Sequence, residues 1–209
     1  MDHLLNLFLP TPCISCQKPG SPFCSTCQSK FTVTVRAISK SGINGYSVCD
    51  YDSLSGDIIN AIKESGQTSL IGPVASLMAK SWPHELASPV LVPIPSSPTN
   101  QKRRGYQHTL KLVNALEKRI PAGTSRALLR SAGDRLDQSK LGPIERLSNL
   151  EGAFEVDLRG FVDEGRPIVL IDDVVTTGAT IASAFSALAR AGLSPLTFFV
   201  FAEARTKTA

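Results

Sequence analysis

The sequence lacks any long hydrophobic run, and nowhere do the roughly 18 consecutive apolar residues that suit a membrane-spanning helix occur. Its first residues, MDHLLNLFLPTP, are briefly apolar, but they carry no basic leader and Pro10 and Pro12 interrupt them. Low-complexity tracts are also missing, which argues against a largely disordered chain. We therefore expect a soluble globular protein of the cytoplasm, without membrane insertion.

Aromatic residues are scarce, with 9 Phe, 3 Tyr and 1 Trp in 209 residues, and none lies among the clustered basic residues. This weakens a stacking platform for single-stranded nucleic acid. No Ser-His-Asp or Cys-His pattern indicates a covalent nucleophile either. The formal net charge of +4 suits an anionic small molecule or nucleic acid, but taken alone it describes an ordinary solvated surface better.

The cysteines are few, but four of them are tightly spaced in two CxxC pairs near the N-terminus. In a chain without a secretory leader such pairs indicate zinc rather than disulfides, because a reducing cytosol keeps thiols free. Free thiols without metal are the alternative, and a redox CxxC is disfavoured because no βαβ pattern surrounds it. Four thiolates close the coordination shell of Zn²⁺, which predicts a structural zinc. The proposed ligands are Cys13, Cys16, Cys24 and Cys27, whereas Cys49 is expected to be a small buried residue.

The rest of the chain alternates strand-like and helix-like segments, which predicts an α/β fold with a mostly parallel sheet flanked by helices. We divide the chain into a small zinc module at 1–38 and a larger domain at 39–209. A short strand or turn is expected near 47–50, and strands at 88–95, 152–156, 166–174 and 196–204. Helices are expected at 56–63, 69–82, 108–119, 142–150 and 180–192. Ligands of such sheets bind beyond the carboxyl ends of the strands.

The stretch IVLIDDVVTTGAT (168–180) places two carboxylates at the end of a buried strand, directly before a hydroxyl-rich turn and a helix. Paired carboxylates are costly unless they accept hydrogen bonds or meet a cation, and a cis-diol with Mg²⁺ nearby supplies both. Hydroxyls and free N–H groups at a helix start suit a phosphate, and Gly178 allows the backbone to approach an anion without a Cβ clash. A plain helix N-cap with solvated acids is the alternative. The pattern favours a ribose 5-phosphate held by Asp172, Asp173, Thr176, Thr177, Gly178, Ala179 and Thr180.

The segment VLIDDVVTTGAT closely resembles the signature with which type I phosphoribosyltransferases bind 5-phosphoribosyl-1-diphosphate (PRPP). Three further segments, AIKESG, LVPIPSSPTNQKRRGYQHTLKL and RLDQSKLGPIERLSNLEGAF, look like the ComF family, as do the CxxC pairs. Members of that family combine an N-terminal zinc ribbon with a phosphoribosyltransferase-like domain and are linked to bacterial competence. The resemblance extends in order over nearly the whole chain.

This resemblance implies a type I phosphoribosyltransferase fold and the displacement of pyrophosphate from PRPP–Mg²⁺ by a nitrogen nucleophile. Such chemistry needs positioning and charge stabilisation more than a covalent nucleophile. It assigns Asp172, Asp173 and Arg104 to catalysis. It assigns Pro93, Ile94 and Arg103 to a loop that binds pyrophosphate. A lid that closes over the substrate would carry Arg130, Arg135, Gln138, Lys140 and Arg146.

One segment departs from the family, which usually reads R-G-[FY]-N-Q after the basic loop, whereas this chain has Gly105-Tyr106-Gln107-His108. His108 fits a residue at the start of a helix better than a catalytic base. Lys63 is expected either to reach the pyrophosphate or acceptor region or to be solvated.

The sequence leaves two functions open. In the first, the chain is a phosphoribosyltransferase with an unidentified acceptor. In the second, it is a non-catalytic accessory protein of competence or DNA processing that binds PRPP or a nucleotide. Its basic loops and zinc ribbon would then contact single-stranded DNA or a helicase partner. A second copy of the chain, in a homodimer, is one more partner that the sequence leaves open.

Overall fold

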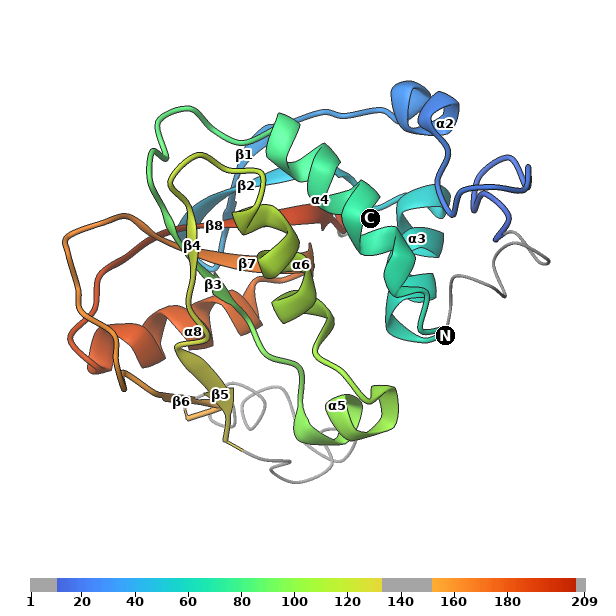
Figure 1. Cartoon of the computed structure of the whole chain (residues 1–209). Coiled ribbons are helices and arrows are strands. Elements are labelled where there is room, and N and C mark those ends of the chain that lie inside the picture. Colours follow the sequence, from blue (N-terminus) through green and yellow to red (C-terminus); the bar gives the residue numbers. More distant parts are fainter. Residues whose placement is uncertain (1–10, 133–151, 206–209) are drawn as a thin grey trace.

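A six-stranded sheet organises residues 11–132 and 152–205, the part of the chain that the computed structural model describes (Figure 1). The strand order is β1-β2-β8-β7-β3-β4, and all neighbours run parallel except β1 and β2. The strands are β1 (Arg36–Lys40), β2 (Ile43–Asp50), β3 (Val90–Pro93), β4 (Thr124–Ser125), β7 (Ile168–Val175) and β8 (Pro195–Glu203). The predicted α/β architecture with a mostly parallel sheet is confirmed.

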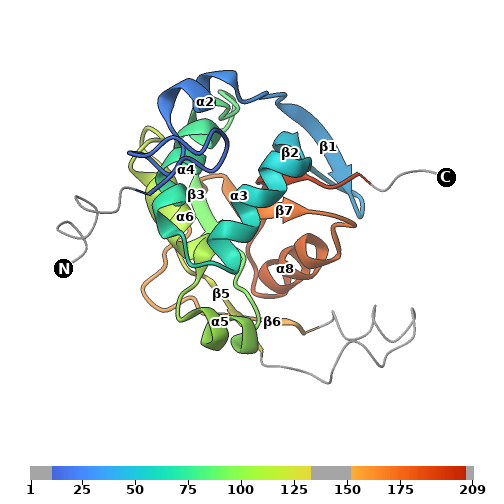
Figure 2. The same cartoon turned by 90° about the vertical axis from the view of Figure 1, so that its right-hand side faces the viewer.

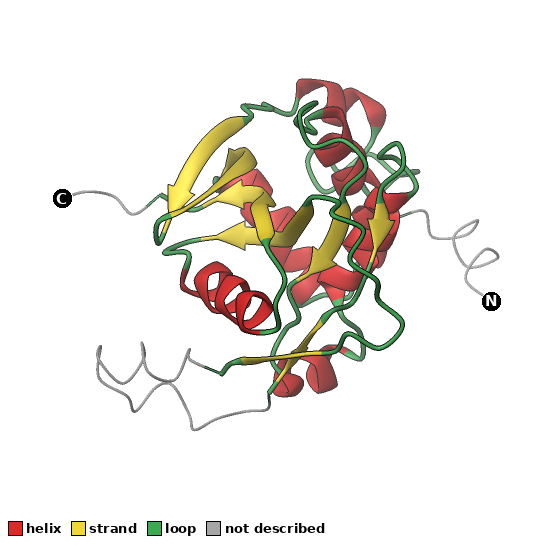
Figure 3. Ribbon diagram, turned by 90° about the vertical axis from the view of Figure 1, so that its left-hand side faces the viewer, coloured by secondary structure: helices red, strands yellow, loops and turns green. Residues whose placement is uncertain are grey.

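Helices cover both faces of this sheet (Figure 3). The helices α3 (Ser53–Lys63), α4 (Ile71–Lys80) and α6 (His108–Glu117) pack on one face, and a short 3₁₀ turn, η1 (Thr68–Leu70), precedes α4. The other face carries α8 (Ala179–Arg190) and the antiparallel ribbon of β5 (Leu129–Ser131) and β6 (Phe154–Val156). Within the described ranges, no helix is long and apolar enough to cross a membrane.

The central strand β7 is apolar on both sides because each of its faces meets a separate core. Val169 and Ile171 belong to the core under α3, α4 and α6, whereas Ile168 and Leu170 belong to the core under α8. All four side chains are buried. The continuous run of hydrophobic residues therefore marks a strand enclosed between two helical layers.

Helix α3 begins at Ser53, three residues before the predicted start at Gly56. A capping box explains the earlier start, because Asp52 Oδ1 accepts a hydrogen bond from Ser55 N at 2.8 Å and Ser55 Oγ accepts one from Asp52 N at 2.8 Å. The helix ends at Lys63, as predicted. Figure 2 shows α3 packed in front of the sheet, and Lys63 at its C-terminus contacts Asp173 of β7.

The basic segment after β3 was predicted as a loop, but the structure forms the short helix α5 (Pro98–Arg104) there. The side chain of Ser97 caps its N-terminus by accepting from Asn100 N, and Pro98 occupies its first turn, where a missing N–H costs nothing. Gly105, with φ of 75°, ends it in the left-handed conformation. The last turn thereby presents Lys102, Arg103 and Arg104 together.

The hairpin of β1 and β2 at the sheet edge was not predicted, apart from a short strand or turn near 47–50. Its turn uses Ser41 and Gly42, both with positive φ, as tight two-residue hairpin turns require. The turn matters for the site because Ser41 Oγ donates a hydrogen bond to the carbonyl of Thr177 at 3.2 Å.

The N-terminal segment with helix α2 (Ser25–Lys30) shares its core with the sheet instead of standing apart. Phe23 and Phe31 are buried, and the Phe31 ring stacks on Phe201 of β8 with 5.7 Å between centroids. The contacts of Phe31 therefore connect the N-terminal segment to the central sheet.

Candidate functional site

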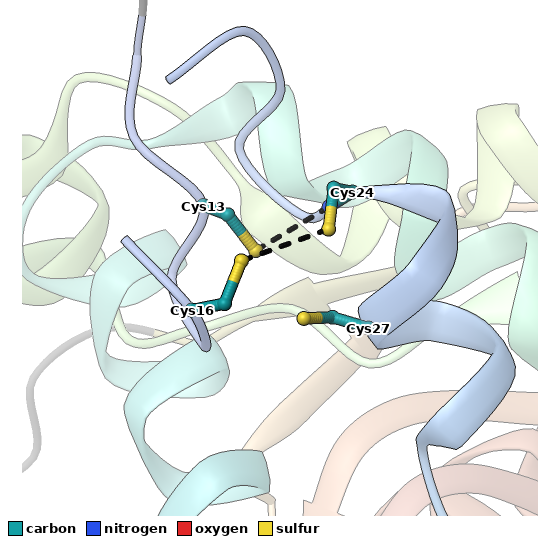
Figure 4. A group of neighbouring side chains, drawn as sticks. All are labelled: Cys13, Cys16, Cys24 and Cys27. Carbon is teal, nitrogen blue, oxygen red and sulfur yellow. Dashed lines mark hydrogen bonds between the residues drawn. The ribbon is translucent and has the colours of Figure 1, made fainter. Parts of the chain in front are cut away.

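The four cysteines of the two CxxC pairs point toward one another (Figure 4). All four Sγ atoms lie within 4.8 Å of one another, and none forms a disulfide. Cys24 and Cys27 lie at the start of α2, and Cys13 Sγ accepts a hydrogen bond from Cys24 N at 3.4 Å. Four converging thiolates suit tetrahedral Zn²⁺, so this group can hold a zinc ion as predicted from the sequence.

The acidities of these thiols differ in a way that suits a cation. Burial alone would raise the pKa of Cys13, but backbone N–H groups of Cys16 and Cys24 lower it to about 6. A hydrogen bond with Ser15 acts to lower the pKa of Cys27, yet burial and the three neighbouring cysteines raise it to about 11. Four thiolates thus repel one another unless a metal ion neutralises them.

Cys49 lies apart from this group, in β2. It is buried, and its thiol donates to the carbonyl of Phe201 at 3.2 Å. Burial raises its pKa to about 12, as expected for an inert thiol in the core.

The acid pair lies inside β7 rather than after it, because the strand continues to Val175 and Asp172 pairs in register with Val200. Asp173 is 7% exposed and Asp172 is half-buried. Asp172 Oδ1 accepts a hydrogen bond from Asp173 N at 2.9 Å. The predicted position near the carboxyl edge holds, but both carboxylates are more enclosed than a strand terminus would leave them.

Two cationic or polar side chains from other elements meet Asp173. Lys63 Nζ, at the end of α3, lies 2.9 Å from Asp173 Oδ2, and His108 Nε2, at the start of α6, lies 3.2 Å from the same oxygen. Both contacts are charge contacts rather than hydrogen bonds, because neither His108 Nε2 nor Asp173 Oδ2 has a hydrogen-bond partner among the described residues. Burial alone would raise the pKa of Asp173, but His108 and Lys63 together lower it below its ordinary value.

Asp172 behaves differently from its neighbour. Burial and the negative charge of Asp173 raise the pKa of Asp172 well above its ordinary value. The pair therefore consists of one fixed anion, Asp173, and one carboxyl that readily carries a proton. Ligand atoms of His108, Asp172 and Asp173 all lie within 4.8 Å of one another, close enough to hold a cation.

The threonine loop joins β7 to α8. The side chains of Thr176, Thr177 and Thr180 are exposed, so their hydroxyls are available to a ligand. Gly178 adopts φ of +88°, and its backbone packs against Lys40 of the hairpin. The sequence predicted that Gly178 allows an anion to approach the backbone, and the structure adds this contact with β1 as a second reason for glycine.

Replacing Gly178 by Ala is expected to lower the free energy of unfolding by about 2–4 kcal/mol, measured by chemical denaturation. The added Cβ would lie 2.5 Å from Lys40 Cβ, in a backbone conformation that L residues rarely adopt. Gly192→Ala is the matched control, because its φ is +83° but a Cβ there meets nothing within 4 Å. Equal losses in both variants would refute the role of the Lys40 contact.

The basic residues of α5 face the end of α3. Arg103 Nη1 donates to Glu64 Oε2, and Arg104 Nη2 donates to Glu64 Oε1 at 2.9 Å. Hydrogen bonds from Arg103 and then Arg104 lower the pKa of Glu64 to about 2. The predicted pyrophosphate-binding arginines are thus already paired with a carboxylate of the chain.

A line of side chains connects these arginines to the acid pair. Arg104 Nη1 lies 3.5 Å from Ser96 Oγ, which in turn lies 3.3 Å from His108 Nδ1, and His108 reaches Asp173. The sequence showed no Ser-His-Asp pattern for a covalent nucleophile, and the structure brings Ser96, His108 and Asp173 together without a hydrogen bond between His108 Nε2 and Asp173 Oδ2. These three residues come from a loop, a helix and a strand, so no motif in the sequence revealed the grouping.

The remaining predicted residues of the β3 end have supporting positions. Pro93 ends β3, and Ile94 is buried with its N–H donating to the carbonyl of Ile171 at 3.0 Å. The carbonyl of Ile94 accepts from Thr109 Oγ1 at 2.7 Å, which fixes the start of α6. These contacts place the loop that carries Ser96 beside His108.

Of the predicted lid residues, Arg130 lies in β5, where its guanidinium pairs with Asp157 next to β6. Arg135, Gln138, Lys140 and Arg146 lie outside the described residues, as does the helix predicted at 142–150.

Comparison with known proteins gives two relatives. The chain is 31% identical over 139 residues to "Competence protein ComFC" of Bacillus subtilis (strain 168), covering 65% of this chain and 53% of that protein. It is 26% identical over 122 residues to "Competence protein F" of Haemophilus influenzae, covering 58% of this chain and 53% of that protein. The chain thus spans about half the length of the curated relatives it matches. No family model matches it. The two relatives confirm the resemblance to ComF proteins.

Proposed function

We propose that this protein binds PRPP together with Mg²⁺ and transfers its phosphoribosyl group to a nitrogen acceptor, with release of pyrophosphate. One observation carries the proposal: the acid pair of β7, the threonine loop and the arginines of α5 all lie at the carboxyl edge of one parallel sheet. Acceptors for a diol, a site for a monoester phosphate and cations for a diphosphate are the three groups that PRPP requires.

Each part of PRPP has a matching partner in this arrangement. The hydroxyls of Thr176, Thr177 and Thr180 and the N–H groups at the start of α8 would hold the 5-phosphate. Asp173, kept ionised by Lys63, would accept hydrogen bonds from the ribose diol. Arg104, whose side chain is 9% exposed, would neutralise the leaving diphosphate with a planar fork of donors.

The acid pair also fits Mg²⁺, because hard cations prefer carboxylate oxygens and Mg²⁺ binds through one or two of them plus substrate phosphates. Asp172 would become a second ligand when Mg²⁺ binds. Burial and the charge of Asp173 raise its pKa, and a nearby cation would lower that pKa and favour the ionised carboxylate. When bound, Mg²⁺ would stabilise negative charge developing on the diphosphate.

The reaction would need few reacting groups from the protein itself. As the C1–diphosphate bond breaks, positive charge on the ribose ring would lie near the carboxylates of β7, while Arg103 and Arg104 would stabilise the leaving group. The acceptor nitrogen would then form the new bond to C1. The protein thus positions the two partners and stabilises both charges.

The experiment that tests this is a PRPP-consumption screen over nitrogenous bases and amines, with pyrophosphate release as the readout. Thermal unfolding with PRPP–Mg²⁺ should run in parallel, and we expect the melting temperature to rise because a ligand that binds only the folded state stabilises it. No rise in melting temperature and no pyrophosphate release would contradict the proposal.

A second function is supported by the names of the two relatives, both competence proteins. In that case the chain would bind PRPP or a nucleotide without turnover and contact single-stranded DNA or a helicase in DNA uptake. PRPP binding without pyrophosphate release from any acceptor, together with salt-sensitive binding of single-stranded DNA, would favour it.

A further inference from the structure

The C-terminus of α3 places two opposite charges against the two oppositely charged halves of the candidate site. Lys63 Nζ contacts Asp173 in the acid pair at 2.9 Å. The next residue, Glu64, contacts Arg103 and Arg104, and its two carboxylate oxygens are shared between them. Two neighbouring residues at the end of α3 therefore contact both halves of the site: Lys63 contacts the acid pair, and Glu64 contacts the arginines.

The position of Glu64 is unfavourable for its own helix. Glu64 is the C-cap of α3, where the helix dipole presents partial negative charge and repels a carboxylate. Only the guanidinium groups of α5, which is separated from α3 by 34 residues of chain, compensate this within the described residues. The contact between α3 and α5 is therefore a property of the site and not of helix stability.

The contact is also one that a ligand can break. The side chains of Glu64 and Arg103 are 42% and 55% exposed, and ion pairs in such surroundings contribute little to stability. Arg104 is more enclosed, and its buried Nε has no hydrogen-bond partner among the described residues. That unused donor indicates that the Glu64 carboxylate satisfies the arginine only in part.

We propose that Glu64 is an internal occupant of the anion site, a carboxylate that a diphosphate must displace from Arg103 and Arg104 in order to bind. Glu64 lowers the affinity of the site for anions and keeps the arginines paired when no ligand is present. The inference rests on the proposed function, because it takes these arginines to be the diphosphate partners.

The test compares inorganic pyrophosphate binding to the wild-type protein, Glu64→Gln and Glu85→Gln by calorimetry at low ionic strength. Glu64→Gln keeps the shape of the side chain and removes its charge, so we expect pyrophosphate to bind about three- to tenfold more tightly. Raising the salt concentration should reduce the difference, because exposed charges are screened. Glu85→Gln is the matched control, since Glu85 bonds to Tyr46, away from the arginines, and the change in net charge is the same.

The outcomes separate this inference from the proposed function. Tighter binding in Glu64→Gln alone supports the inference. Unchanged binding in Glu64→Gln, while the wild type binds, overturns it. Weaker binding also overturns it and shows that Glu64 orients the arginines instead. An equal gain in Glu85→Gln also overturns it, as an effect of net charge. Absence of binding in every variant overturns both the inference and the pyrophosphate role of α5.

Discussion

Replacing Asp172 by Asn is expected to leave the ligand-free fold nearly unchanged and to weaken PRPP–Mg²⁺ binding by about 10- to 100-fold. Burial and the charge of Asp173 raise the pKa of Asp172, so the free protein disfavours a second full negative charge there. An amide closely matches that group in shape and hydrogen bonding. Binding of a cation or diol instead needs the ionised carboxylate, which Asn cannot provide. Calorimetry with PRPP–Mg²⁺ measures the loss.

The companion variant Asp173→Asn should behave differently, with a loss of unfolding free energy of about 2–4 kcal/mol before any ligand is added. Asp173 is 7% exposed and compensates the charge of Lys63, so its removal leaves that ammonium group without its partner. Chemical denaturation of the ligand-free variants measures this difference.

Asp163→Asn is a suitable control for both variants, because Asp163 is exposed and, among the described residues, its carboxylate accepts a local hydrogen bond from Gly165 N at 2.9 Å. It should change neither stability nor binding appreciably. PRPP binding that survives in Asp172→Asn would remove this residue from the site. Equal stability of Asp173→Asn and the wild type would show that the Lys63 contact contributes nothing.

Removal of zinc is expected to have the second large effect, a loss of unfolding free energy on the order of 4 kcal/mol or more. The cysteine segment is short, and beyond Phe23 and Phe31 it has few large apolar residues to maintain its turns. Because Phe31 stacks on Phe201, loosening of the segment also exposes part of the main core. Denaturation with and without a chelator, alongside elemental analysis, measures the effect.

Single substitutions sharpen this test. Cys16→Ser and Cys27→Ser should reduce the zinc content well below one ion per chain, because each removes one of four converging thiolates. Cys49→Ala removes a buried thiol outside the group and should retain zinc. A wild-type protein without bound zinc, or full zinc content in Cys16→Ser, would show that the group is not a zinc site.

Local patterns in the sequence were sufficient for much of the fold. The apolar run before Asp172 predicted a strand enclosed on both faces. The alternation of strand-like and helix-like segments predicted a mostly parallel sheet. Both predictions were possible because burial determines the spacing of apolar residues along the chain. The spacing of Cys13, Cys16, Cys24 and Cys27 predicted a four-thiolate group for a similar reason, since each CxxC is a single tight turn. Short helices were harder to predict. Helix α5 depends on the cap at Ser97, and its sequence has no apolar residues at helical spacing.

The sequence by itself determined which chemical groups the protein has at the carboxyl edge of the sheet: the acid pair, the threonine loop and the basic segment. Only the tertiary structure decided how they are paired. Lys63 precedes Asp173 by 110 residues and Glu64 precedes Arg104 by 40 residues. Both contacts exist because α3 ends close to the carboxyl end of β7 and to α5. Such charge pairs leave no periodic trace, since any exposed lysine or glutamate has the same local pattern. The electrostatics of the site, including the opposite pKa shifts of its two carboxyl groups, therefore follow from packing and could not be predicted from the motifs.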